Sequence, residues 1–156
     1  MKRVLVPVDG SERAEAAVRE VMRQAQAGAM EIDLINVQPR IFPEETLIGL
    51  PPEKIDTYYY EQGTKALASS EKLLRDAGVP FTSHRAVGPI AETIVAKAGE
   101  LGCDGIVMST RGHGKIAGML LGSVSTKVLH LSPVPVTLVT AERRDRNCVT
   151  EETGKA

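Results

Sequence analysis

Residues 106–125 read IVMSTRGHGKIAGMLLGSVS. An apolar run opens here into a glycine-rich loop, and the loop ends on Gly122 and Ser123 at the start of an amphipathic segment. The first backbone N–H groups of a helix have no partner inside the helix, so they bind phosphate readily. The stretch therefore predicts a strand, a phosphate-binding loop and a helix, which is one unit of an α/β fold.

The same alternation of short apolar runs with longer segments of helical period continues along the chain. It is typical of βαβ units, which build a parallel sheet covered by helices on both faces. Right-handed crossovers favour a single open five-stranded parallel sheet of order 3-2-1-4-5. The expected strands are 3–8, 31–37, 80–87, 105–109 and 135–140, and the expected helices are 12–27, 54–77, 89–101 and 123–131.

The length of 156 residues and the hydrophobic content of 42% suit one compact domain. We expect this domain to span 1–141, and residues 142–156 to form a disordered polar tail because they contain few apolar residues. Lys and Arg number 19 against 20 Asp and Glu, and this near cancellation argues against nucleic acid as a partner.

Membrane insertion and export are also not expected. No apolar stretch approaches the roughly 18 residues that a membrane span needs, and the first residues turn to Pro, Asp and Gly too early for a signal peptide. The expected location is the cytoplasm. Cys103 and Cys148 lie far apart without CxxC spacing, so we expect two reduced thiols and no zinc site.

Two of the expected helices show a clear inward face. In the first, Ser11 is the expected N-cap and Gly28 the end, with Ala14, Ala17, Val18, Val21 and Ala25 facing inward. In the second, small residues dominate the stripe, which favours close packing on the sheet; its members are Tyr59, Gly63, Ala66, Ser70, Leu73 and Ala77. The connection 38–53 carries four prolines and little period, as lids often do.

The predicted sheet order brings the ends of strands one and four to the reversal point, where ligands of open α/β sheets bind. Asp9 follows strand one, and its carboxylate suits a ribose hydroxyl or an adenine amine. Ser123, Val124 and Ser125 offer N–H and hydroxyl donors to phosphate, and Gly112 lets the backbone approach the ligand. Two loops distant in sequence thus predict one nucleotide site.

The same residues could instead have purely structural roles, and this alternative stays open. Asp9, Gly10 and Ser11 also form a good turn and cap, and loop glycines and a capping Ser123 are ordinary features. His113, Lys115 and Arg111 are side chains that a loop usually displays to water, and Lys127 is expected on a solvated helix face.

Other known sites fit worse. The P-loop spacing and the GxGxxG of dinucleotide sites are absent from the sequence, and so are HExxH and GxSxG. The phosphoacceptor Asp of response-regulator receivers has no counterpart at the end of strand three. No general base or arginine finger can be named, so we expect slow hydrolysis of a bound nucleotide at most.

Several stretches resemble the universal stress protein family. They are VLVPVDGS at 4–11, AETI at 91–94, DGIVM at 104–108, LLGSV at 120–124 and PVPVTLV at 133–139. The glycine loop of that family reads Gly, two residues, Gly, nine residues, Gly and Ser or Thr. Gly112, Gly122 and Ser123 match this motif, and Ser109 stands where the first Gly is usual. The resemblance implies a Rossmann-like fold of the adenine nucleotide alpha hydrolase type, and membership of the ATP-binding branch.

The resemblance also implies roles for individual residues. Adenosine would be held by Pro7, Val8, Asp9 and Val37. The sugar and phosphates would be lined by Met108, Ser109, Gly112, Gly122, Ser123, Val124 and Ser125. Mg²⁺ or Mn²⁺ would be carried by the phosphates and not by protein side chains.

Two functions follow from the family. One is an ATP-binding regulatory module that senses nucleotide in stress adaptation, and the other is a nucleotide-free interaction or scaffold protein on the same fold. The family is similarly dimeric through its last strand. Here that strand is an apolar edge that a partner strand would close, through Val134, Val136 and Leu138.

Overall fold

The computed structural model describes residues 2–42, 49–110 and 121–140. Gly112, Arg111, His113 and Lys115 of the glycine loop lie outside the described residues. The same holds for Cys148 and for the predicted polar tail. No helix within the described residues is long and apolar enough to cross a bilayer.

Strands and helices alternate as the sequence predicts. The strands are β1 (Lys2–Pro7), β2 (Met30–Gln38), β3 (Phe81–Val87), β4 (Gly105–Thr110) and β5 (Val136–Thr140). The helices are α1 (Ala14–Ala27), α2 (Pro52–Asp76), α3 (Ile90–Glu100) and α4 (Ser123–Leu131). Each predicted element is therefore present, with its ends shifted by at most two residues.

The five strands form one parallel sheet in the order β3-β2-β1-β4-β5, which confirms the predicted topology. β1 lies at the centre, where Val4 pairs with Ile32 of β2 on one side and with Gly105 of β4 on the other. The order reverses between β1 and β4. The carboxyl ends of these two strands therefore flank the crevice in which open α/β sheets bind ligands.

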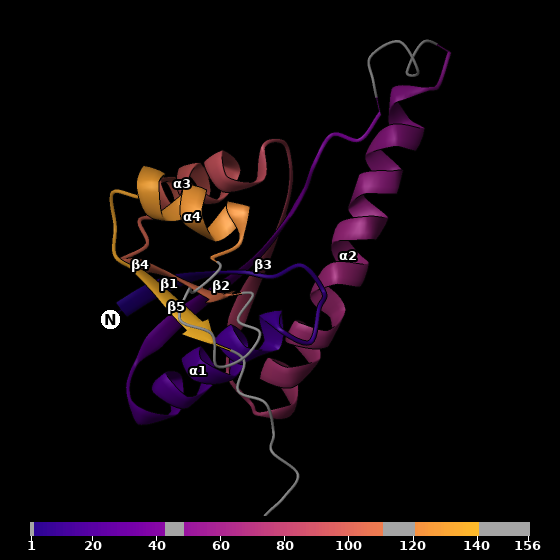
Figure 1. Cartoon of the computed structure of the whole chain (residues 1–156). Coiled ribbons are helices and arrows are strands. Elements are labelled where there is room, and N and C mark those ends of the chain that lie inside the picture. The colour runs from indigo at the N-terminus through magenta and orange to yellow at the C-terminus, as the bar shows by residue number, and fades with distance from the viewer. Residues whose placement is uncertain (1, 43–48, 111–120, 141–156) are drawn as a thin grey trace, which may run out of the picture.

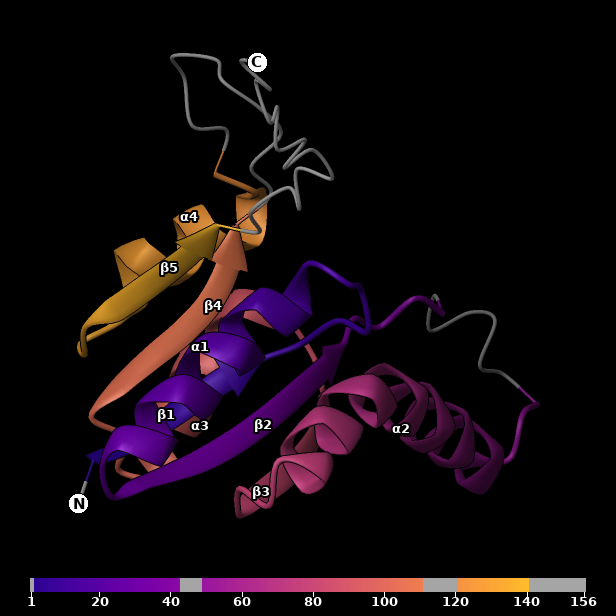
Figure 2. The same ribbon diagram turned by 90° about the horizontal axis from the view of Figure 1, so that it is seen from below.

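Helices cover both faces of the sheet, as Figures 1 and 2 show. The cores on the two faces alternate along β1: Val4 and Val6 pack toward α1 and α2, whereas Leu5 packs toward α3 and α4. This alternation explains why the central strands read as continuous apolar runs. Cys103 is buried in the second core, as expected for a small apolar residue, and burial raises the pKa of its thiol.

Two details of the helices differ from the prediction. α1 begins at Ala14 and not at residue 12, because residues 11–13 form a turn; the Ser11 hydroxyl still accepts a hydrogen bond from the Ala14 N–H at 3.3 Å. The buried stripe of α2 consists of Tyr59, Gly63, Leu67, Ser70 and Leu74. Leu67 and Leu74 replace the predicted Ala66 and Leu73, because the buried face of a long helix is set by the elements that it packs against. Ala77 lies beyond the end of the helix.

The small residues of α2 do allow close packing. A Cβ on Gly63 would come within 3.3 Å of the Arg85 side chain on β3. The N-terminal half of α2 projects beyond the sheet, and the segment that follows β2 runs toward it (Figures 1 and 2). Phe42 stacks edge-on against Tyr58 and Tyr59, and the Ile41 N–H donates to the Tyr59 hydroxyl at 3.1 Å. The described start of the predicted lid is thus attached to α2.

Candidate functional site

A cavity of about 370 Å³ lies at the carboxyl ends of β1 and β4. Ten of the eleven predicted site residues line it: Pro7, Val8, Asp9, Val37, Met108, Ser109, Gly122, Ser123, Val124 and Ser125. The eleventh, Gly112, is outside the described residues. The structure therefore brings together two loops that are separated by about a hundred residues of sequence.

One wall of the cavity is apolar. Val37 and Met108 line it together with Ile90 and Ile94, one turn apart on α3. These side chains belong to, or pack against, the core between the sheet and α3 and α4. Such a wall suits the flat face of a nucleobase. Ile90 and Ile94 were not predicted to be site residues, although their spacing of four after Pro89 places both on one helix face.

The turn after β1 holds the Asp9 carboxylate in a defined position. Asp9 Oδ1 accepts hydrogen bonds from the Ser11 N–H at 3.0 Å and the Ser11 hydroxyl at 2.5 Å. Among the described residues, no donor reaches Asp9 Oδ2. Asp9 can therefore stabilise the turn and bind a ligand at the same time, because one carboxylate oxygen closes the turn and the other is available to a ligand hydroxyl or amine.

Gly10 fixes the same turn against α2. Its φ of +82° lies in the left-handed region that favours glycine. A Cβ at this position would also lie only 3.0 Å from the Ala66 backbone Cα. The turn that carries Asp9 therefore packs directly against α2.

The end of β1 is held by a buried amide that the sequence did not reveal. Asn36 is 3% exposed, and its Nδ2 donates to the Val8 carbonyl at 2.8 Å. Gln38 Nε2 in turn donates to Asn36 Oδ1 at 2.6 Å. Because Val8 and Gln38 both line the cavity, this chain of hydrogen bonds sets the spacing of the two strand ends. A single Asn within an apolar strand was the available signal.

The N-terminus of α4 opens on the opposite side of the cavity. Gly122 is the N-cap, and none of the described side chains caps the helix. The first backbone bond of the helix runs from the Thr126 N–H to the Gly122 carbonyl at 3.0 Å. Within the described residues, the N–H groups of Ser123, Val124 and Ser125 have no acceptor. Unpaired amides at the positive end of a helix form an anion site.

Ser109 does not strain the backbone. It lies in β4 opposite Val139, and no non-glycine residue of the described chain has a positive φ. The glycine usual at this position in the resembling family is therefore not required by the conformation seen here. Next to it, Thr110 is buried in the cavity lining, and its hydroxyl has no hydrogen-bond partner among the residues that the structure describes.

Lys127 lies on a solvated face of α4, as predicted, with its side chain 57% exposed. Its ammonium pairs with the Glu92 carboxylate, which connects α4 to α3 and lowers the pKa of Glu92. The described parts of the chain contain no cluster of three or more side chains that would hold a metal ion.

The chain matches the family model "Universal stress protein family" over residues 1–140. It is 31% identical over 144 residues to universal stress protein YxiE of Bacillus subtilis, covering 88% of this chain and 97% of the relative. The solved structure of protein MJ0577 of Methanocaldococcus jannaschii superposes with a TM-score of 0.74 at 29% identity, covering 91% of this chain and 97% of that one.

A universal stress protein solved in complex with cAMP has the same fold, with a TM-score of 0.64 at 24% identity and coverage of 89% and 96%. The family model extends over the complete sheet and all four helices, including both loops that line the cavity. The chain therefore belongs to the universal stress protein family.

Proposed function

We propose that this protein binds an adenine nucleotide, ATP first of all, and acts as a regulatory module that senses nucleotide in stress adaptation. The observation that carries the proposal is the composition of one cavity. An apolar wall, an unpartnered carboxylate oxygen on Asp9 and the free N–H groups at the start of α4 meet there. These features match the base, ribose and phosphates of a nucleotide, respectively.

In the proposed complex the base lies against the apolar wall, between Pro7, Val8 and Val37 at the strand ends and Met108 of β4. Asp9 Oδ2 accepts a ribose hydroxyl. The phosphates lie at Gly122, Ser123, Val124 and Ser125, near Ser109. The sequence motif adds Gly112, which lies outside the described residues. Mg²⁺ or Mn²⁺ binds through the phosphates, since hard cations prefer oxygen ligands.

A universal stress protein was solved with cAMP, which supports an adenine nucleotide as the ligand class. The alternative is a nucleotide-free scaffold protein, with Ser109 as the mark of lost binding. The unstrained backbone of Ser109 favours the nucleotide-binding alternative. Hydrolysis is expected to be slow at most. The bound nucleotide would therefore act as a regulatory signal and not as a rapidly turned-over substrate.

Calorimetric titration with Mg-ATP tests the proposal, and Asp9→Asn is the informative variant. The amide oxygen of Asn preserves the contacts with Ser11, whereas its NH₂ group replaces the oxygen that would accept the ribose hydroxyl. A charged hydrogen bond of about 1.5–3 kcal/mol corresponds to an affinity loss of roughly ten- to a hundredfold. Asp76→Asn removes the same charge at the far end of α2 and is expected to bind like the wild type. Wild-type protein that binds no adenine nucleotide would favour the scaffold alternative.

The proposed switch element is the connection 38–53. Pro39 lines the cavity, and Ile41 and Phe42 contact α2, so the described start of the connection runs from the ligand site to the projecting helix. Ordering of this connection over ATP is expected to protect it from proteases. Unchanged cleavage at saturating Mg-ATP would contradict this proposal without affecting nucleotide binding itself.

We also propose a homodimer through β5. Within the described sheet, β5 pairs with β4 only, and its other edge is open. Val136 and Leu138 of β5 are only half-buried, and so is Val134 just before the strand. A partner strand would complete the hydrogen bonds and cover these side chains. Sedimentation that detects only monomer at micromolar concentration would refute the dimer.

A further inference from the structure

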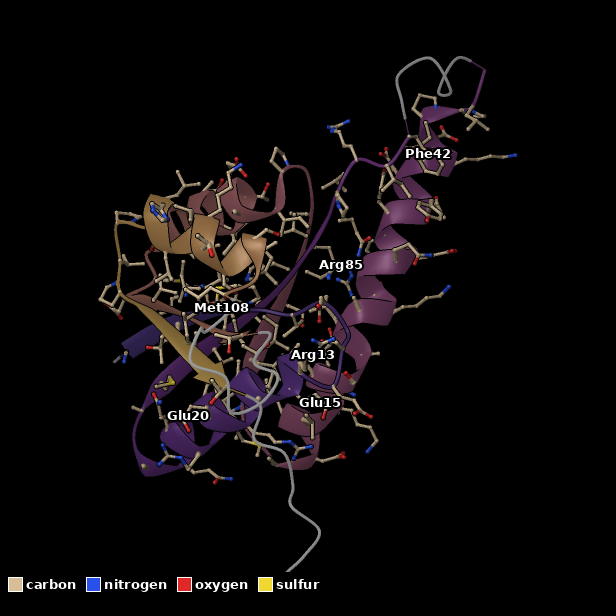
Figure 3. The ribbon with its side chains drawn as sticks, viewed as in Figure 1. Arg13, Glu15, Glu20, Phe42, Arg85 and Met108 are labelled. Carbon is tan, nitrogen blue, oxygen red and sulfur yellow. The ribbon has the colours of Figure 1, made fainter. Side chains whose placement is uncertain are left out.

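Arg13 lies at the mouth of the nucleotide cavity, although its sequence context gives no sign of a ligand role. It is the last residue before α1 and lines the cavity together with Asp9 and Ser11 of the same turn. Figure 3 labels it at the beginning of α1, with Met108 of the cavity lining also labelled. Among the described residues that line the cavity, Arg13 carries the only cationic side chain and Asp9 the only anionic one.

The guanidinium of Arg13 has no partner in the described part of the protein. Neither a hydrogen bond nor an ion pair connects it to another described residue. The two other arginines of α1 are different: Arg19 pairs with Glu15, and Arg23 pairs with Glu20. An unpaired exposed arginine beside a cavity keeps all five of its N–H donors available for a ligand.

The backbone that carries Arg13 is fixed even though its side chain is free. The Ala14 N–H donates to the Ser11 carbonyl at 3.1 Å, and the Ala16 N–H donates to the Arg13 carbonyl at 3.1 Å. Gly10 holds the same turn against Ala66 of α2. The side chain therefore starts from a defined point next to the Asp9 carboxylate, which lowers the entropic cost of reaching a ligand.

The charge of the cavity fits a phosphate tail. Ala14 at the start of α1, Ile90 at the start of α3 and Ser123 at the start of α4 all line it, so three helices direct their positive ends toward it. The Asp9 carboxylate accepts hydrogen bonds from the turn and, in the proposed complex, from the ribose. Arg13 is then the cavity side chain that can neutralise phosphate charge. Its planar fork matches two oxygens of one phosphate group.

We infer that Arg13 is a specificity-determining residue that contacts the phosphate tail and makes the protein prefer ATP to adenosine. The inference rests on the proposed nucleotide function. It extends that function because it assigns part of the preference to a side chain outside the glycine motif.

The test compares the affinities of Arg13→Gln and wild-type protein for Mg-ATP, AMP and adenosine by calorimetry. The ratio of ATP affinity to adenosine affinity is expected to fall about tenfold in the variant, with adenosine binding unchanged, because a partly exposed charged hydrogen bond contributes toward the low end of its range. Arg13→Lys keeps the charge without the fork and should restore part of the ratio. AMP shows whether the contact is already made at the first phosphate.

Arg19→Gln is the matched control, because it removes the same charge from a nearby position on α1 that does not line the cavity. It should keep the wild-type ratio. An Arg13→Gln ratio equal to that of Arg19→Gln overturns the inference while wild-type ATP binding still stands. An equal loss of adenosine and ATP affinity also overturns it, because the residue would then support the fold of the site and not the phosphates. Wild-type protein that binds neither ligand refutes the proposed function itself.

Discussion

Substitution of Gly10 tests directly whether the turn after β1 is packed tightly against α2. Replacing Gly10 with Ala should destabilise the protein in two ways. A side chain at φ +82° is strained, at a cost of about 1–2 kcal/mol. The new Cβ would also lie 3.0 Å from the Ala66 backbone, and relieving such overpacking costs about 1–3 kcal/mol. The free energy of unfolding of Gly10→Ala is therefore expected to fall by roughly 2–5 kcal/mol.

Two other glycines separate these contributions. Gly78 has a φ of +66° with nothing within 4 Å of a Cβ, so Gly78→Ala should show the backbone strain alone. Gly28 has an extended φ of −171° and the same open space, so Gly28→Ala should change stability by no more than about 0.5 kcal/mol. All three variants add one methyl group. They differ in whether φ is positive and in whether the new Cβ meets a neighbouring atom.

Urea unfolding of the three variants is the assay. The expected order of destabilisation is Gly10→Ala, then Gly78→Ala, then Gly28→Ala. Equal losses in Gly10→Ala and Gly78→Ala would refute the argument that α2 is packed rigidly against the turn. ATP affinity supplies a second readout, because only Gly10→Ala should displace the Asp9 carboxylate.

Three further predictions concern the core and the strand ends. Asp33 is buried, and although desolvation raises the pKa of its carboxyl, hydrogen bonds from Arg3 and His84 outweigh that effect and hold the pKa below its ordinary value of 3.8. The ionised carboxylate contributes its full stability above pH 3.8 and loses it as the pH falls through the lower pKa of the folded state. The difference in unfolding free energy between wild type and Asp33→Asn should therefore shrink on acidification below about pH 4. A difference that does not change with pH would contradict this. Asn36→Ala removes the buried donor to the Val8 carbonyl and should cost about 1–3 kcal/mol in urea unfolding, whereas no loss would mean that water replaces the amide. Leu67→Ala, at a fully buried position beneath α2, should cost about 2–5 kcal/mol, and a thermal midpoint equal to that of the wild type would show that the predicted stripe through Ala66 was correct after all.

Local patterns in the sequence were sufficient for the elements and their order. The Val- and Ile-rich runs predict buried parallel strands, and the crossover rule orders them, so the sheet follows from short-range information. The same patterns located the ends of β1 and β4, which is why ten predicted site residues line one cavity. Asp9 and Ser123 could be predicted as candidate site residues because turns and helix termini depend on residues that are neighbours in sequence.

Contacts between distant residues were decided only by the tertiary structure. Arg3, Asp33 and His84 lie on three different strands, and their hydrogen bonds exist only because the strands pair in this register. Ile90 and Ile94 became cavity residues because α3 packs across the sheet. Leu67 faces the core in place of Ala66 because the inward face of a long helix depends on what it packs against.

The proposed nucleotide site combines both kinds of information. The sequence by itself determined which groups are available, since the glycine motif, Asp9 and the start of α4 are local features. Only the folded chain decided that Ser109 lies in unstrained strand backbone, that Asp9 keeps one oxygen free, and that Arg13 is left unpaired at the cavity among the described residues. The physical reason is that backbone angles, hydrogen-bond partners and charge neighbours are set by contacts across the fold, which no local pattern records.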